Sequence, residues 1–212
     1  SRWYRSNIRW VGENPAVGLS SWAGTKMCGA SGQRVDEIIS TYDPGGQVLR
    51  QQPNLAIIHL GTNDMTQFTS GTWVGGSIAL SISNLSTLLT TIFANKPDIL
   101  VCVCKIIPNQ GASDSNITSW NAAMETMVLA HANASRIFIA DCNTAFKNDA
   151  TWATDYMSDN THPNDAGEAV MATAILSAIQ ANITLMTRNA AQTRRTIVPK
   201  VSALSYTAST AT

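Results

Sequence analysis

The fold is decided by the stretch LAIIHLGTND at residues 55–64. Its first six residues form an apolar-rich run with the β-branched Ile57 and Ile58, which is typical of a strand buried on both faces of a parallel sheet. Gly61 ends this run, and Asn63 follows just beyond the carboxyl end of the strand. Ligands of open α/β sheets bind at that edge, where an Asn amide can donate to an oxygen that acquires negative charge. A polar turn of ordinary residues is the alternative interpretation.

Outward from this strand, apolar runs alternate with amphipathic stretches. We expect strands at residues 8–11, 55–60, 99–107 and 136–140, and helices at residues 33–41, 77–94, 117–132 and 163–183. Residues 42–53, 65–76 and 141–160 are predicted to be turn-rich or irregular connections. Pro163 suits the first turn of the last helix. The alternation predicts a mostly parallel sheet with right-handed crossovers.

The composition describes a globular chain with little charge. Hydrophobic residues make up 44% of the 212 residues, charged residues 13%, and the formal net charge is zero. This balance argues against a nucleic-acid partner, which needs clustered Lys and Arg, and no apolar run approaches the roughly 18 residues of a membrane helix. We predict one domain at residues 1–187 and a C-terminal extension at residues 188–212.

Four Asn-X-Ser/Thr sequons favour a secreted, extracellular protein. They lie at Asn84, Asn116, Asn133 and Asn182. A chain this rich in Asn, Ser and Thr also produces sequons by chance, so secretion is an expectation from composition.

The four cysteines do not indicate a metal site. Cys102 and Cys104 alternate along a predicted strand, so they share one face, and we expect both to be buried free thiols. A bridge between Cys28 and Cys142 stays open. No Cys/His spacing resembles a zinc site.

Asp159 and His162 are the candidate acid–base pair. Three residues separate them on a turn that enters the last predicted helix. This spacing lets the carboxylate accept from one ring nitrogen while the other faces a cleft, so that the imidazole can serve a hydroxyl nucleophile as general base. The alternative is that the pair only caps the helix. His59, inside the central strand, is predicted to be a core histidine bonded to a neighbour.

These motifs occur in an order that resembles a known family. Gly29-Ala30-Ser31-Gly32-Gln33, the Gly61–Asp64 turn and Asp159-X-X-His162 together resemble the SGNH (GDSL-like) hydrolases. More narrowly, the chain is similar to the third carbohydrate-esterase family, which includes acetylxylan esterases. The segments that carry this narrower likeness are residues 59–65, 105–109, 120–123 and 161–167, and the resemblance covers roughly residues 8–179.

The resemblance implies a serine esterase with a three-layer α/β/α sandwich and a mostly parallel five-stranded sheet. It assigns the oxyanion hole to the Gly32 backbone N–H and the Asn63 side chain, the general base to His162, and the orienting carboxylate to Asp159. It implies no cofactor and no catalytic metal.

The implied reaction is removal of O-acetyl groups from a polysaccharide such as xylan. Asn109, Trp120 and Trp152 are candidate substrate-binding residues because they lie in or near loops expected to rim the cleft. Trp22 and Trp73 occupy similar positions, and for all of the Trp residues ordinary packing is the alternative. A general short-chain or lipolytic ester hydrolase is the second candidate function, and a non-catalytic carbohydrate-binding relative is the third.

The nucleophile is where the sequence departs from the family. The family's serine lies in a Gly-Asp-Ser motif after the first strand, and this chain has no Gly-Asp-Ser. Residues 8–11 match the family's second strand. Three explanations stay open: a truncated or processed chain, a tail at residues 201–207 that supplies the missing strand with Ser205 as nucleophile, or a relative without catalysis. Ser31 is a weaker candidate because it adjoins Gly32.

Overall fold

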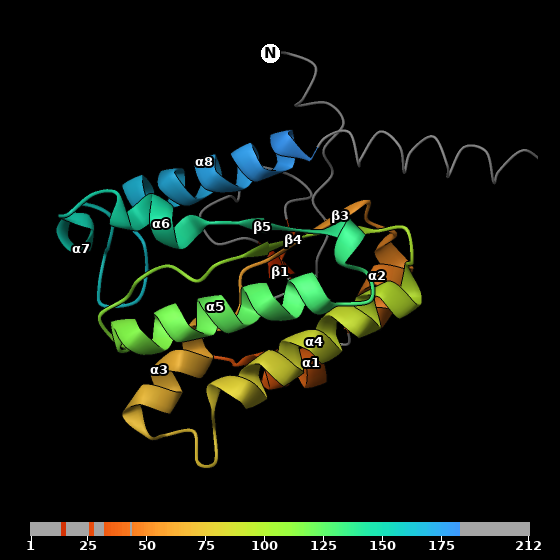
Figure 1. Cartoon of the computed structure of the whole chain (residues 1–212), viewed down its shortest axis with the longest axis horizontal. Coiled ribbons are helices and arrows are strands. Elements are labelled where there is room, and N and C mark those ends of the chain that lie inside the picture. The colour runs from red at the N-terminus through yellow and green to blue at the C-terminus, as the bar shows by residue number, and fades with distance from the viewer. Residues whose placement is uncertain (1–13, 16–25, 28–31, 43, 183–212) are drawn as a thin grey trace, which may run out of the picture.

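The computed structural model describes residues 14–15, 26–27, 32–42 and 44–182 (Figure 1). Its centre is a three-stranded parallel sheet with strand order β3-β4-β5, formed by β3 (Leu55–Ile58), β4 (Leu100–Cys104) and β5 (Ile137–Ala140). A separate antiparallel pair joins β1 (Asn14–Pro15) to β2 (Lys26–Met27). The expected strand at residues 8–11 lies outside the described residues.

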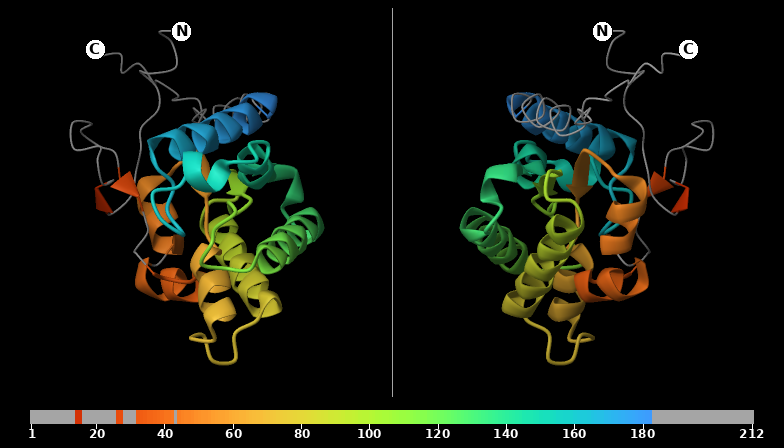
Figure 2. Two further views of the ribbon diagram at one scale, coloured as in Figure 1. Left: turned by 90° about the vertical axis from the view of Figure 1, so that its left-hand side faces the viewer. Right: turned by 90° about the vertical axis from the view of Figure 1, so that its right-hand side faces the viewer.

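Helices cover both faces of this sheet, which confirms the predicted three-layer α/β/α arrangement (Figure 2). One layer holds α1 (Val35–Tyr42), α2 (Pro44–Gln51), α4 (Ile78–Asn95) and α5 (Asp114–Ala130). The opposite layer holds α6 (Cys142–Lys147) and α8 (Asp165–Ala181). The remaining elements are α3 (Thr62–Ser70), the 3-10 helix η1 (Ala134–Arg136) and α7 (Trp152–Asp155).

The central strand β4 divides the core into two halves. Val101 and Val103 pack with the layer of α4 and α5, whereas Cys102 and Cys104 pack with the layer of α8. All five residues of the strand are buried, as expected for a strand covered on both faces. The two cysteines are buried free thiols, as predicted, and Cys142 is also buried with a free thiol.

Helix α4 is long and apolar enough to span a membrane by length and composition alone. In the fold, however, Leu85, Leu88, Leu89 and Ile92 are buried in the core, and the helix packs against α1, α2 and α5. Ser77 caps its start by accepting from the Leu80 N–H at 3.1 Å. These contacts are those of a core helix in a globular domain.

The prediction of a turn-rich connection at residues 42–53 is wrong, because α2 forms there. Pro44 opens the helix and Val48 is buried. Gly45 faces α4 so closely that a Cβ would lie 2.6 Å from Asn95 Nδ2 and 2.9 Å from Thr91 Cγ2. The glycine that weakens the helical pattern is therefore what allows the two helices to approach each other.

The prediction of an irregular stretch at residues 65–76 is also wrong in its first half, which belongs to α3. Gly61 precedes the helix with φ +114°, and Gly71 ends it with φ +73°. Its Thr residues have modest helix propensity, yet Met65 is fully buried in the core and anchors the helix. Tertiary packing decides the conformation here.

Residues 141–160, predicted as mostly loop, contain the short helices α6 and α7. Asp141 starts α6 by accepting from the Thr144 N–H at 2.9 Å. The last helix α8 begins later than predicted, and its cap is Asn164, which accepts from the Gly167 N–H at 3.0 Å. Pro163 therefore lies before the helix, in an isolated bridge with Met157, instead of in its first turn.

Candidate active site

The predicted site segments meet where the strands of the sheet end. The backbone carbonyl of Asn160, in the turn between α7 and α8, accepts from the backbone N–H groups of Gln110 at 2.7 Å and Gly111 at 3.3 Å. A Cβ on Gly111 would lie 3.1 Å from Thr161 Oγ1 and 3.5 Å from Thr66 Cγ2 of α3. The loop after β4 thus links the turn of Asp159 and His162 to α3, and both loops lie at the left in Figure 1.

The Asp159 carboxylate holds the His162 ring from one side. Oδ2 lies 2.8 Å and Oδ1 3.1 Å from His162 Nδ1. Oδ1 also accepts from the backbone N–H groups of Thr161 and His162, each at 2.7 Å. The contact with the His162 ring and these two backbone bonds lower the pKa of Asp159 to about 2. The carboxylate is therefore ionised throughout the range in which an imidazole titrates.

The other side of His162 is open. Its side chain is 68% exposed, and within the described residues its Nε2 makes no hydrogen bond. The Ser158 hydroxyl and backbone N–H both donate to the His162 carbonyl, at 3.0 and 2.9 Å, and fix the turn. The interpretation that this pair only caps α8 is wrong, because Asn164 is the cap.

Asn63 and Gly32, the predicted oxyanion donors, lie in adjoining segments. Asn63 is in the first turn of α3, and its Nδ2 donates to the Gln33 carbonyl at 2.9 Å. One of its two amide hydrogens is thereby used, which leaves the second for a ligand. Gly32 is exposed and has φ +77°, a conformation that favours glycine. The structure thus brings both donors to one edge of the sheet.

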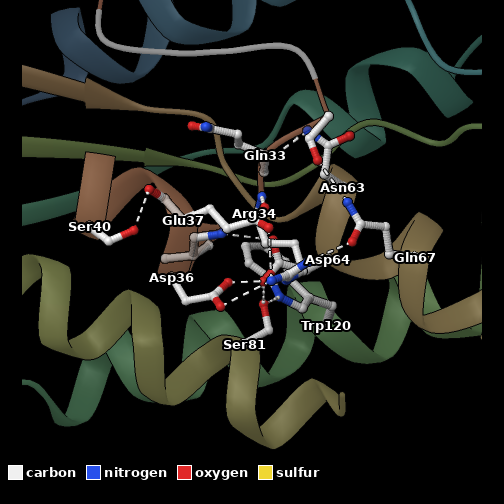
Figure 3. A network of polar contacts seen from close by, with 12 residues as sticks. Gln33, Arg34, Asp36, Glu37, Ser40, Asn63, Asp64, Gln67, Ser81 and Trp120 are labelled. Carbon is white, nitrogen blue, oxygen red and sulfur yellow. Dashed lines mark hydrogen bonds and ion pairs between the residues drawn. The ribbon is translucent and has the colours of Figure 1, made fainter. Parts of the chain in front are cut away.

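A buried polar network lies beneath these donors (Figure 3). Asp64 accepts from the Val35 N–H at 3.1 Å and from the Ser81 hydroxyl at 2.7 Å. Ser81 accepts in turn from Trp120 Nε1 at 2.8 Å. Desolvation by burial raises the pKa of Asp64 against the opposing effect of these hydrogen bonds. The network joins α1, α3, α4 and α5.

Trp120 lies in the core, which favours the packing interpretation over the predicted role in substrate binding. Its side chain is fully buried, and a Cβ on Gly61 would lie 2.4 Å from its ring. Trp152, at the start of α7, is half-buried and packs against the core on the α8 side, which favours the packing interpretation. Neither indole projects fully into solvent as a stacking platform.

Asn109 is buried in the loop after β4. Its Oδ1 accepts from the Ala112 N–H at 2.7 Å, which closes the loop. Its Nδ2 is buried and has no hydrogen-bond partner in the part of the chain that the structure describes. A substrate-binding role for Asn109 stays a prediction. The candidate nucleophiles Ser205 and Ser31 lie outside the described residues.

His59 is half-buried, and its Nε2 atom is shielded from solvent, which agrees with the predicted core histidine. Desolvation lowers its pKa to about 4, so the ring is neutral at physiological pH. The predicted bond to a neighbour is not seen at Nε2, which has no partner among the described residues. No group of three His, Cys, Asp or Glu side chains in the described ranges could hold a metal ion.

The sequence analysis missed two polar residues of this site, Arg34 and Gln67. Gln67 Nε2 donates to the Gly32 carbonyl at 2.7 Å, and Arg34 Nη1 donates to Gln67 Oε1 at 2.7 Å. The Arg34 guanidinium also lies 5.1 Å from the centre of the Trp73 ring, and a Cβ on Gly76 would lie 2.2 Å from that ring. These contacts favour packing for Trp73. The four-residue spacing of Asn63 and Gln67 is a signal only once α3 is recognised as a helix.

Comparison with known protein families identifies one family for this chain. The sequence model of the GDSL-like lipase/acylhydrolase family matches residues 2–170. No curated protein matches the chain significantly.

Solved structures share the fold. A carbohydrate esterase of family 3 from Talaromyces cellulolyticus is 25% identical, with a TM-score of 0.66 over 86% of this chain and 84% of that one. A family 3 carbohydrate esterase from Clostridium thermocellum is 22% identical, with a TM-score of 0.65 over 85% and 80% of the two chains. A catalytic mutant of an acetylxylan esterase from Geobacillus stearothermophilus is 16% identical, with a TM-score of 0.57 over 74% and 70%.

Proposed function

The chain belongs to the GDSL-like lipase/acylhydrolase family, and from that premise we propose that it is an esterase that works by acyl transfer. The observation that carries this proposal is the Asp159–His162 pair. The ionised carboxylate holds Nδ1 at 2.8 Å, and the ring is 68% exposed. A histidine held in this way can take a proton from a hydroxyl nucleophile through Nε2 and return it to the leaving alcohol.

Asn63 and Gly32 support the same reaction as oxyanion donors. The second amide hydrogen of Asn63 and the backbone N–H of Gly32 belong to segments that are hydrogen-bonded to each other at 2.9 Å. Each donor aimed at the developing negative charge would stabilise the transition state by about 3 kcal/mol. Since these donors are fixed before the ester binds, little reorganisation would accompany the reaction.

We infer that the substrates are acetyl esters of a polysaccharide such as xylan and that the protein is secreted. The likeness to the family 3 carbohydrate esterase supports the substrate class, and the four sequons support secretion. The described side chains around the site are mainly polar, including Asn63, Thr66 and Gln67. A lipolytic or longer-chain esterase would present a more apolar surface to its acyl group, which makes it the second candidate. A carbohydrate-binding relative without catalysis is the third.

Hydrolysis of 4-nitrophenyl acetate by the purified chain tests the proposal. We expect turnover that falls at least about a hundredfold in His162→Ala, because the general base is lost. His131→Ala is the matched control, since His131 ends α5 and contacts Thr90 and Phe93 instead of the site. Absence of turnover in the wild type would favour the binding protein.

Two further measurements separate the remaining alternatives. Release of acetate from acetylated xylan, with little cleavage of longer acyl esters, distinguishes the carbohydrate esterase from the lipolytic enzyme. Labelling with a fluorophosphonate and mapping the modified peptide identifies the nucleophile. Label on Ser205 would assign the nucleophile to the tail, and label on Ser31 would assign it to the segment beside Gly32.

A further inference from the structure

The segment Gly32–Val35, which leads into α1, is fixed to α3 by three side chains. Gln67 Nε2 donates to the Gly32 carbonyl at 2.7 Å, and Asn63 Nδ2 donates to the Gln33 carbonyl at 2.9 Å. Asp64 accepts from the Val35 N–H at 3.1 Å. Asn63 and Gln67 are four residues apart, so both amides project from one face of the helix. Two consecutive carbonyls are thus held from the same direction (Figure 3).

Arg34 fixes which way the Gln67 amide points. Its Nη1 donates to Gln67 Oε1 at 2.7 Å, and because a guanidinium can only donate, the amide oxygen must face Arg34. The amide nitrogen therefore faces the Gly32 carbonyl. Arg34 itself is held by Asp36, at 3.1 Å from Nε, and by Glu37, at 3.0 Å from Nη2.

These contacts hold Gly32, one of the two oxyanion donors in the proposed function. Gly32 has φ +77°, a conformation that glycine adopts without steric cost and that residues with a Cβ rarely adopt. Because a glycine backbone rotates freely, the hydrogen bond from Gln67 to the Gly32 carbonyl restricts the directions that the Gly32 N–H can take relative to α3. Asn63 belongs to the same helix, so both oxyanion donors are positioned by α3.

We propose that Gln67 is a positioning residue that, oriented by Arg34, holds the Gly32 N–H in register with the Asn63 amide to form the oxyanion hole. The inference rests on the proposed esterase function. In this assignment Gln67 acts through Gly32 and does not contact the nucleophile or the acyl group: its Oε1 accepts from Arg34 and its Nε2 donates to the Gly32 carbonyl. Its loss therefore affects the rate of acyl transfer more than the binding of the ester.

Gln67→Glu is the decisive variant. A glutamate keeps the length of the side chain and can still accept from Arg34, but its carboxylate cannot donate to the Gly32 carbonyl. Gln67→Ala removes both contacts. Ser70→Ala is the matched control, because Ser70 is an exposed residue at the end of α3 whose hydroxyl, among the described residues, bonds to the Gln67 carbonyl and to Thr72.

The experiment combines 4-nitrophenyl acetate kinetics, thermal unfolding and the NMR order parameter of the Gly32 N–H, which reports how freely that bond changes direction. We expect both Gln67 variants to lose about 10- to 100-fold in kcat, with KM within about twofold and a lower order parameter at Gly32. Ser70→Ala should match the wild type. The proposal is overturned if Gln67→Glu keeps the wild-type kcat. It is also overturned if Ser70→Ala loses as much kcat as Gln67→Glu does.

Failure of the esterase function gives a different result from failure of this inference. If the wild type hydrolyses no ester, the proposed function fails, and the role of Gln67 is then decided by the order parameter of the Gly32 N–H alone. A lower order parameter in Gln67→Glu at unchanged melting temperature supports the positioning role. An unchanged order parameter at Gly32 overturns it.

Discussion

At the scale of single residues, the pKa of Asp159 sets how far the pH can fall before the Asp159–His162 pair loses its ionised carboxylate. Its pKa is lowered to about 2 by hydrogen bonds from the His162 ring and two backbone N–H groups. A carboxylate whose pKa is lower in the folded than in the unfolded protein stabilises the native state at pH values above its unfolded-state pKa of about 4. That contribution is lost as the pH falls toward the folded-state pKa of about 2. Between pH 3 and 8, Asp159 therefore stays ionised and keeps its contact with the His162 ring.

Asp159→Asn tests this assignment. The amide cannot stabilise an imidazolium and can hold the ring in the wrong tautomer, so kcat should fall by about 10³–10⁴ with KM little changed. The pH–rate profile of the wild type on 4-nitrophenyl acetate should show no inflection from Asp159 above pH 3, because its pKa is lowered to about 2. Asp155→Asn, in α7, serves as the control carboxylate. A kcat within threefold of the wild type for Asp159→Asn would contradict the role.

Local spacing explains which residues could be predicted. Asp159 and His162 are three residues apart and interact inside one turn, so their pairing follows from the sequence alone. Trp120 could not be placed in this way, because only the packing of α5 against α4 decides that its ring is buried and its Nε1 bonds to Ser81. The bond from Asn63 to Gln33 spans 30 residues and depends on the fold.

At the scale of elements, Asn121 of α5 extends the sheet beyond the end of β4. Its Oδ1 accepts from the Ile106 N–H at 2.9 Å, and its Nδ2 donates to the Ile106 carbonyl at 3.0 Å. The side chain thus pairs with this backbone as a neighbouring strand would. It is buried, and it fixes the loop that contacts the Asp159–His162 turn.

Asn121→Ala should destabilise the fold by about 2–3 kcal/mol. The buried Ile106 N–H loses its acceptor, and the Ile106 carbonyl loses one of its two donors and keeps Asn143. Urea unfolding followed by circular dichroism measures this change. Asn116→Ala, at a half-buried position near the start of the same helix, controls for the loss of an amide that contacts only Thr69. An Asn121→Ala midpoint equal to that of Asn116→Ala would contradict the strand-like role.

The missed elements share a physical cause. The glycine pair that precedes Gln47 in α2 and the Thr residues of α3 lower intrinsic helix propensity, so both stretches read as turns. Each helix nevertheless forms because it buries an anchor, Val48 in α2 and Met65 in α3. The long helices α4 and α5 and the strands β3, β4 and β5 were predictable because their apolar patterns extend over many residues.

At the scale of the whole molecule, the alternation of strands and helices predicted the layers, but not the buried polar network that joins α1, α3, α4 and α5. Asp64 lies at the junction of α1, α3 and α4, where it accepts from Val35 and Ser81. Nothing in the local sequence distinguishes this carboxylate from a turn residue. Its burial appears only when segments separated by 29 and 17 residues come together.

This buried carboxylate gives the molecule a pH dependence of opposite sign to that of Asp159. Desolvation raises the pKa of Asp64, so the native state binds the proton more tightly than the unfolded chain. Stability therefore falls as the pH rises from the unfolded value of about 4 through the raised native value. Asp64→Asn keeps an acceptor for Val35 and removes the titration, so its urea midpoint should fall less between pH 4 and 7 than that of the wild type. Parallel midpoints for the two proteins across this range would show that Asp64 contributes nothing to the dependence.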